Sequence, residues 1–202
     1  ALSDDAERSG THDFGRDILP RLLHEERVMA YNFRDNEIPG LNYYEEPAYW
    51  RDVGTIPAYW QANMDLLGET PLNDLRNTAW PICGEAARGL PASLVNCYVD
   101  HALIGEGSRV IEADIRRSVI GRHVRIEPGA QIEDSVILDH TSIGAKARVR
   151  RVVIDRGNAV PAGSVLGHDE TAVVPVCGVT ASGLTVVPKG ILPQDVSKQR
   201  LS

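Results

Sequence analysis

The sequence has 202 residues, of which 43% are hydrophobic and 24% are charged, a composition typical of a globular chain with one large or two small domains. The formal net charge of −7 argues against a general nucleic-acid binder, which carries a basic surplus, and weakly against binding to an anionic membrane. No apolar run is long enough to predict a membrane-spanning helix.

The first 69 residues carry mixed helix and strand signals. A short helix is predicted after Asp13, whose carboxylate can cap it. The stretches 27–33 and 49–54 are expected to form short strands. Thr55 is then a typical cap for a helix that runs to about Leu67. That helix has one apolar face, made of Tyr59, Trp60, Met64 and Leu67.

Residues 70–93 are expected to form a connector with little regular structure, and a different pattern starts at residue 94. From there, small aliphatic residues recur every five or six positions, whereas a helix needs spacings of three and four and a flat sheet a spacing of two. The series consists of Ile104, Val110, Ile115, Ile120, Ile126, Ile132, Ile137, Ile143, Val149, Ile154 and Val160.

The same series repeats at intervals of 17 residues, so that Ile126, Ile143 and Val160 align. This period predicts a solenoid with three short strands per turn and one inward side chain on each strand. The corners, where positive φ or close packing is needed, can be served by Gly105, Gly121, Gly144 and Gly163. We therefore predict three parts: residues 1–69, the connector 70–93, and the solenoid 94–202.

The three cysteines are Cys83, Cys97 and Cys177. Their number is odd and no pair has the spacing of a metal site, so the sequence predicts free thiols rather than disulfides or a zinc site. Free thiols are typical of a reducing compartment, and we expect a cytoplasmic protein.

The order of three segments resembles bacterial glucose-1-phosphate adenylyltransferase. These segments are "HDFGRDILPRL", then "AYWRDVGTIPAYWQANMDLL", then a solenoid that ends in "RRVVIDRGNAVPAGSVLG". The repeats themselves are similar to the hexapeptide repeats of left-handed β-helix proteins. The resemblance implies a mainly β fold, in which a left-handed parallel β-helix follows an incomplete α/β part of a nucleotidyltransferase domain.

The resemblance also implies a reaction, in which ATP and glucose 1-phosphate give ADP-glucose and pyrophosphate for glycogen or starch synthesis. It implies Mg²⁺, a homotetramer and allosteric regulation by metabolites. In the family, the "WRDVGT" segment lines the sugar-phosphate pocket, so Asp52 would be a catalytic Mg²⁺ ligand and Trp50 would contact glucose 1-phosphate. Arg51 would point the opposite way along the strand and form a structural salt bridge. The alternative is that Asp52 only forms a turn beside Gly54.

Some features of the family have no counterpart in this sequence, among them its glycine-rich nucleotide loop and its second metal-binding acid. The stretch "GEGSR" at 105–109 lies inside the solenoid and lacks the Lys-Ser/Thr of a phosphate-binding loop. We therefore expect that the chain alone cannot form ADP-glucose.

Two other functions stay open. The basic run with Arg148, Arg150 and Arg151 is a candidate contact for anionic effectors, which would suit a non-catalytic oligomerisation or regulatory module, although most such runs are solvated. His123 and His140 are 17 residues apart and are expected to stack on adjacent coils. A histidine general base would suit a hexapeptide acyltransferase, but no long insertion interrupts the repeats.

Overall fold

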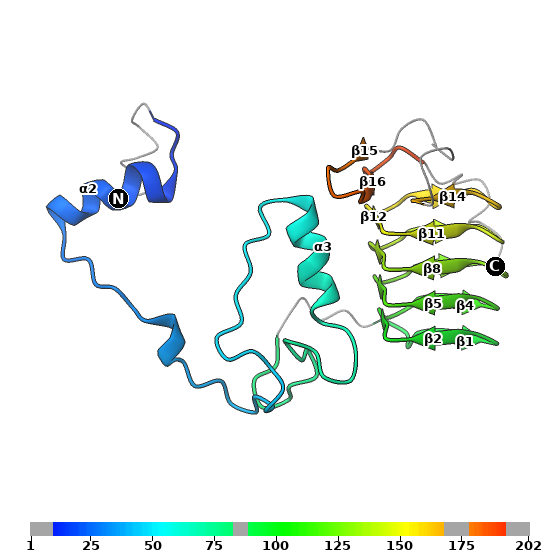
Figure 1. Cartoon of the computed structure of the whole chain (residues 1–202), viewed down its shortest axis with the longest axis horizontal. Coiled ribbons are helices and arrows are strands. Elements are labelled where there is room, and N and C mark those ends of the chain that lie inside the picture. The colour runs from blue at the N-terminus through cyan, green and yellow to red at the C-terminus, as the bar shows by residue number, and fades with distance from the viewer. Residues whose placement is uncertain (1–9, 83–88, 168–177, 193–202) are drawn as a thin grey trace. The chain divides into compact units, whose positions relative to one another are not determined.

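The computed structural model describes residues 10–82, 89–167 and 178–192. The chain forms two compact units, Ala1–Glu37 and Ile38–Ser202 (Figure 1). Within the described ranges, the helices are all too short or too polar to cross a bilayer.

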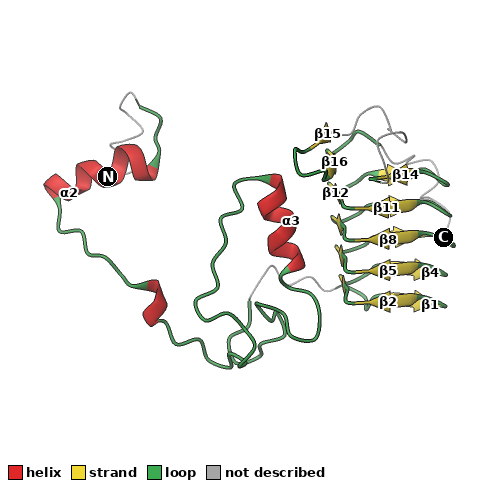
Figure 2. Cartoon of the chain, viewed as in Figure 1, coloured by secondary structure: helices red, strands yellow, loops and turns green. Residues whose placement is uncertain are grey.

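The first unit contains a π-helical turn, η1 (Phe14–Ile18), that continues into α2 (Leu19–Glu25), followed by a 3₁₀ turn, η2 (Phe33–Asp35). The predicted cap is confirmed, because an Asp13 carboxylate oxygen accepts a hydrogen bond from the Arg16 N–H at 2.7 Å. The predicted strand at 27–33 is wrong, since no strand is assigned there (Figure 2). A strand needs a neighbouring strand for its backbone hydrogen bonds, and no described segment pairs with this one.

The second unit is dominated by a parallel β-helix with three sheets (Figure 1). One sheet has the order β1 (Ser93–Val95), β4 (Arg109–Ile111), β7 (Arg125–Ile126), β10 (Ser142–Ile143), β13 (Ala159–Val160). The next has the order β14 (Val165–Leu166), β11 (Arg148–Arg150), β8 (Gln131–Glu133), β5 (Asp114–Arg116), β2 (Tyr98–Asp100). The third has the order β15 (Gly178–Val179), β16 (Thr185–Val187), β12 (Val152–Ile154), β9 (Val136–Ile137), β6 (Val119–Ile120), β3 (Leu103–Ile104).

The strand register confirms the predicted solenoid. Ile126 pairs with Ile143 and Ile143 with Val160, which is the alignment that the 17-residue period predicts. In the first coils the period is one residue shorter, as in the pairing of Val110 with Ile126. Every described strand pair is parallel except β15–β16, which is antiparallel.

The inward side chains form one continuous apolar core. Nearly the whole aliphatic series is buried, and Ile126, Ile137 and Ile154 have no exposed surface. Each buried Val or Ile contributes about 1.5–3 kcal/mol through removal of apolar surface from water. Successive coils therefore stabilise one another through contacts that repeat along the axis.

The corners of the coils use glycine for two different reasons. Gly163 has a φ of 71°, in the left-handed region that glycine adopts without strain. Gly144 instead permits close packing, because a Cβ there would lie 2.5 Å from the backbone nitrogen of Ala162. Many other corner residues with positive φ are not glycine: Asn96, His101, Glu112, Arg117, His123, Asp134, His140, Lys146 and Arg151.

The helix α3 (Ile56–Met64) begins at the predicted cap, where the Thr55 hydroxyl oxygen accepts a hydrogen bond from the Ala58 N–H at 3.3 Å. It ends three residues before Leu67, so the predicted end is wrong. Its predicted apolar face is confirmed. Met64 packs with residues of β9 and β12 and with Leu184, which directly precedes β16, and Tyr59, Trp60 and Leu67 join the same cluster. The helix therefore covers a face of the solenoid, where the indole N–H of Trp60 donates to the Asp134 carbonyl oxygen at 2.8 Å.

Candidate functional site

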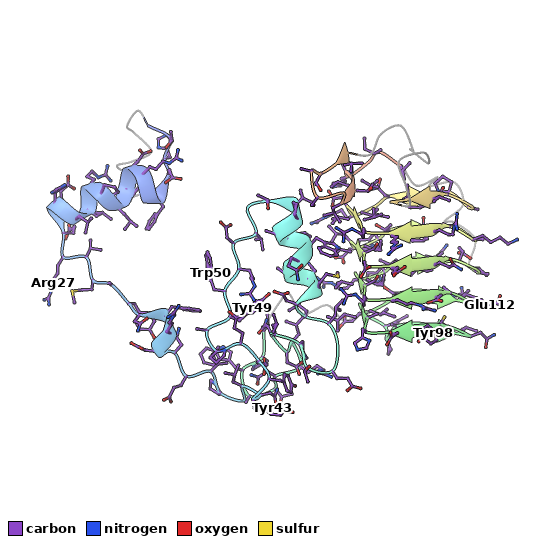
Figure 3. All side chains as sticks on the ribbon, viewed as in Figure 1. Arg27, Tyr43, Tyr49, Trp50, Tyr98 and Glu112 are labelled. Atoms are coloured by element: carbon purple, nitrogen blue, oxygen red, sulfur yellow. The ribbon has the colours of Figure 1, made fainter. Side chains whose placement is uncertain are left out.

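The segment 47–54 carries two of the predicted site residues. The predicted strand at 49–54 is wrong, because no described segment pairs with it. Trp50 is 67% exposed and points away from α3 (Figure 3). Asp52 is also exposed, and its Oδ1 accepts a hydrogen bond from the Gly54 N–H at 2.9 Å. Asp52 thus forms a local turn and still presents its carboxylate to solvent, which leaves both interpretations of this residue open.

Arg51, between these two residues, makes the predicted salt bridge. Its Nη2 lies 2.5 Å from Glu46 Oε2, and its Nε lies 3.0 Å from Asp65 Oδ2. The guanidinium carbon also lies 4.4 Å from the centre of the Tyr49 ring, a cation–π distance. Hydrogen bonds to Glu46 and Asp65 raise the pKa of Arg51, and the same contact lowers the pKa of Glu46. This arginine is therefore a fixed structural cation.

A second polar network holds the loop before this segment to the loop after α3. Asp74 is buried and accepts two hydrogen bonds from the Arg76 guanidinium, each at 2.8 Å, and one from the Tyr44 hydroxyl at 2.9 Å. The Arg76 contact holds the pKa of Asp74 well below its usual value. Burial would raise the pKa of Glu45, but hydrogen bonds from the backbone N–H groups of Asn42 and Asp74 outweigh it and lower that pKa.

The lowered pKa of Asp74 predicts an acid-sensitive loop region. A carboxyl whose pKa is depressed by folding stabilises the native state above its unfolded pKa of 3.8, and this contribution is lost as the pH falls through the lower folded pKa. We expect Asp74→Asn to lower the melting temperature at pH 7, and the gap to wild type to shrink as the pH falls below about 4. Tryptophan fluorescence reports this region, because all three tryptophans lie between residues 50 and 80. A gap that stays the same from pH 7 to pH 3 would contradict this role.

The basic run at the end of the solenoid does not form a single cluster. Arg148 and Arg150 are exposed on the outer face of β11, and Val149 between them is buried. Arg150 Nε lies 3.6 Å from Glu133 Oε2. Arg151 stands at a corner with a φ of 53° and places its guanidinium carbon 5.2 Å from the centre of the Trp60 ring. Only the first two arginines therefore share a surface, and their contact with effectors stays a prediction.

The predicted histidine stack is present. The rings of His123 and His140 are parallel within 9°, and their centres lie 5.1 Å apart. Both residues are exposed corner residues with positive φ. A catalytic role for either histidine stays a prediction.

The thiol prediction is tested at one position. Cys97 is a free cysteine and is partly buried. Cys83 and Cys177 lie outside the described residues.

One cavity of about 330 Å³ lies between the loop after α3 and the first coil of the solenoid. Its wall combines leucines with Asp74, Arg76 and His101, whose Nδ1 lies 2.7 Å from Asp100 Oδ1. Neither Trp50 nor Asp52 lines it. This cavity cannot be predicted from the sequence, because residues 70–93 show no periodicity that would indicate a folded wall.

The described residues contain no group of three or more His, Cys, Asp or Glu side chains that could hold a metal ion. A divalent cation at Asp52 would therefore depend on ligands from elsewhere.

Comparison with known proteins identifies both parts of the chain. Residues 1–69 match the family model "Nucleotidyl transferase", and residues 92–187 match "GlmU-like, C-terminal hexapeptide". The chain is 36% identical over 195 residues to a glucose-1-phosphate adenylyltransferase of Thermodesulfovibrio yellowstonii, covering 96% of this chain and 47% of that protein. It is 39% identical over 201 residues to one of Cutibacterium acnes, covering 95% and 47%.

The chain thus spans about half the length of the curated relatives it matches. The agreement covers the "WRDVGT" segment, the helix α3 and the hexapeptide coils together, so it does not depend on the widespread solenoid alone. The chain belongs to the glucose-1-phosphate adenylyltransferase family and corresponds to a C-terminal portion of its members.

Proposed function

We propose that the longer protein represented by this chain transfers the adenylyl group of ATP to glucose 1-phosphate. A phosphate oxygen of glucose 1-phosphate forms a bond to the α-phosphorus of ATP, and the bond from that phosphorus to the β-phosphate oxygen breaks. The products are ADP-glucose and pyrophosphate. The single observation that carries this proposal is the 36–39% identity to glucose-1-phosphate adenylyltransferases over at least 95% of the chain.

Within that protein, the segment around Trp50 and Asp52 would contribute to the glucose 1-phosphate site. The exposed indole of Trp50 and the exposed carboxylate of Asp52 are accessible to a ligand. The nucleotide would bind to residues outside this chain, because its 202 residues contain no glycine-rich phosphate loop.

The segment around Asp52 would supply only part of a Mg²⁺ site. Magnesium is commonly bound by one or two carboxylates together with substrate phosphates and water. Asp52 offers one exposed carboxylate, and the hydrogen bond from the Gly54 N–H occupies only the Oδ1 atom of that carboxylate. In the proposed role, Asp52 would hold the ion, and the ion would neutralise charge between the two phosphates.

The arginines near the end of the solenoid would take part in regulation of the longer protein. Arg148 and Arg150 share an exposed sheet face and would attract anionic effectors, whereas Arg151 would contribute through its corner beside Trp60.

The parallel β-helix would support assembly into a homotetramer. The product would enter glycogen or starch synthesis in the cytoplasm. The same exposed arginines would also serve a non-catalytic regulatory subunit.

The proposed function is tested by an assay of pyrophosphate release with ATP, glucose 1-phosphate and Mg²⁺. We expect the full-length protein to produce ADP-glucose and the 202-residue chain to produce none. Omission of glucose 1-phosphate is the control for simple ATP hydrolysis. ADP-glucose from the chain alone would show that the nucleotide site lies within it, and no ADP-glucose from the full-length protein would refute the proposed activity.

A further inference from the structure

The segment 47–54 is held in place by side chains rather than by backbone–backbone hydrogen bonds. None of its residues makes a backbone–backbone hydrogen bond to another described residue. A loop without such bonds depends on side-chain contacts for its position. Two side chains of this loop, Arg51 and Tyr49, hydrogen-bond to Asp65 at the end of α3.

Arg51 makes the larger set of contacts. Its Nη1 and Nη2 donate to the Glu46 carboxylate at 3.2 and 2.5 Å, and its Nε donates to Asp65 Oδ2 at 3.0 Å. Its Nη1 also donates to the carbonyl oxygen of Trp50 at 2.9 Å. One guanidinium therefore binds a carboxylate before the loop, a carboxylate after it, and the backbone of the loop itself.

Asp65 is the fixed end of this arrangement. Its side chain is only 7% exposed, and it accepts hydrogen bonds from Arg51, from the Tyr49 hydroxyl at 3.3 Å and from Gln61 Nε2 at 2.9 Å. Asp65 also caps the C-terminus of α3. Because α3 is anchored on the solenoid through Met64 and Trp60, the position of Asp65 is set by the solenoid.

We propose that Arg51 is a positioning residue that holds Trp50 and Asp52 in place relative to α3 and the solenoid. The effect of Arg51 on catalysis rests on the proposed function, whereas its effect on the position of the loop does not. Arg51 is flanked directly by both site residues, so loss of its contacts releases the backbone that carries them. The guanidinium fork is essential, because a lysine ammonium cannot engage Glu46 and Asp65 with the same geometry.

The positioning is tested on the 202-residue chain by amide hydrogen exchange. The Gly54 N–H reports on Asp52, because it donates to the Asp52 carboxylate. We expect Arg51→Gln to accelerate exchange at Gly54 by about two- to tenfold, the range that corresponds to loss of one hydrogen bond. The matched control is Arg116→Gln, since Arg116 likewise binds a carboxylate, Asp114, and lies 4.9 Å from a tyrosine ring. Equal exchange at Gly54 in wild type and Arg51→Gln overturns the proposal.

The catalytic consequence is tested on the full-length protein. We expect Arg51→Gln to lower kcat/KM for glucose 1-phosphate by about 10- to 100-fold, with a smaller loss for Arg51→Lys. Arg116→Gln is expected to keep wild-type kinetics, and the melting temperatures of the two Gln variants separate loss of positioning from loss of folding. Faster exchange at Gly54 with unchanged kinetics would overturn the catalytic part alone. A wild-type protein that makes no ADP-glucose would refute the proposed function, and the exchange measurement would still decide the positioning.

Discussion

Ile137→Ala is expected to destabilise the second unit by about 2–5 kcal/mol, because it leaves a cavity in a closely packed core. Ile137 has no exposed surface and pairs with Ile120 on one neighbouring coil and Ile154 on the other. The coils on both sides are held by their own backbone hydrogen bonds, so they cannot collapse fully into the space. For a chain of this size, the loss corresponds to a fall in melting temperature of about 4–20 °C.

Thermal and urea unfolding followed by far-ultraviolet circular dichroism measure this effect. The control is Ile82→Ala, the same change at a side chain that is 71% exposed, and we expect it to alter stability by less than about 0.5 kcal/mol. If the two variants unfold alike, Ile137 is not part of a packed interior and the solenoid core as described is wrong.

Asp52→Asn is expected to lower the rate of ADP-glucose formation by the full-length protein about 100- to 1,000-fold, because the protein would lose the negative charge that binds Mg²⁺. An asparagine side chain keeps an oxygen that can accept the Gly54 N–H, so the local turn is retained. The substitution thereby separates the two interpretations of this residue. A turn former predicts unchanged activity, and a metal ligand predicts a large loss.

The Mg²⁺ dependence of the initial rate is the decisive measurement. We expect Asp52→Asn to require a higher Mg²⁺ concentration for half-maximal rate. Asp155→Asn serves as the control, since Asp155 Oδ1 likewise accepts a local backbone N–H, that of Arg156, at 2.7 Å. Wild-type activity in Asp52→Asn, or an equal loss in both variants, would exclude Asp52 as the metal ligand.

The solenoid could be predicted because its pattern is local and repeated. Each inward residue, such as Ile126 or Ile143, follows the last by five or six positions, and the register of one coil then places the next. Helix caps are also local: Asp13 and Thr55 each bond an N–H three residues further along the chain. Signals of this kind depend on neighbours in sequence, so they are present before any tertiary contact forms.

The two strands predicted at 27–33 and 49–54 failed for the opposite reason. Alternating or β-branched residues favour extended backbone, but a strand exists only where another segment supplies hydrogen-bond partners. No described segment does so for either stretch. The stretch 49–54 is held instead by Arg51, whose partner Asp65 is 14 residues away.

The coil period, the inward aliphatic series, the helix caps and the family can all be predicted from the sequence alone, because each depends on residue spacing or on a contiguous motif. Three other features are visible only in the folded chain: α3 covers a solenoid face, Arg51 ties the Trp50–Asp52 loop to Asp65, and Arg151 turns away from Arg148 and Arg150 toward Trp60. The first two features are contacts between residues that are distant in sequence, and the third depends on the change of chain direction at a corner. Packing and desolvation in the folded unit decide which residues make these contacts, and no local sequence pattern specifies them.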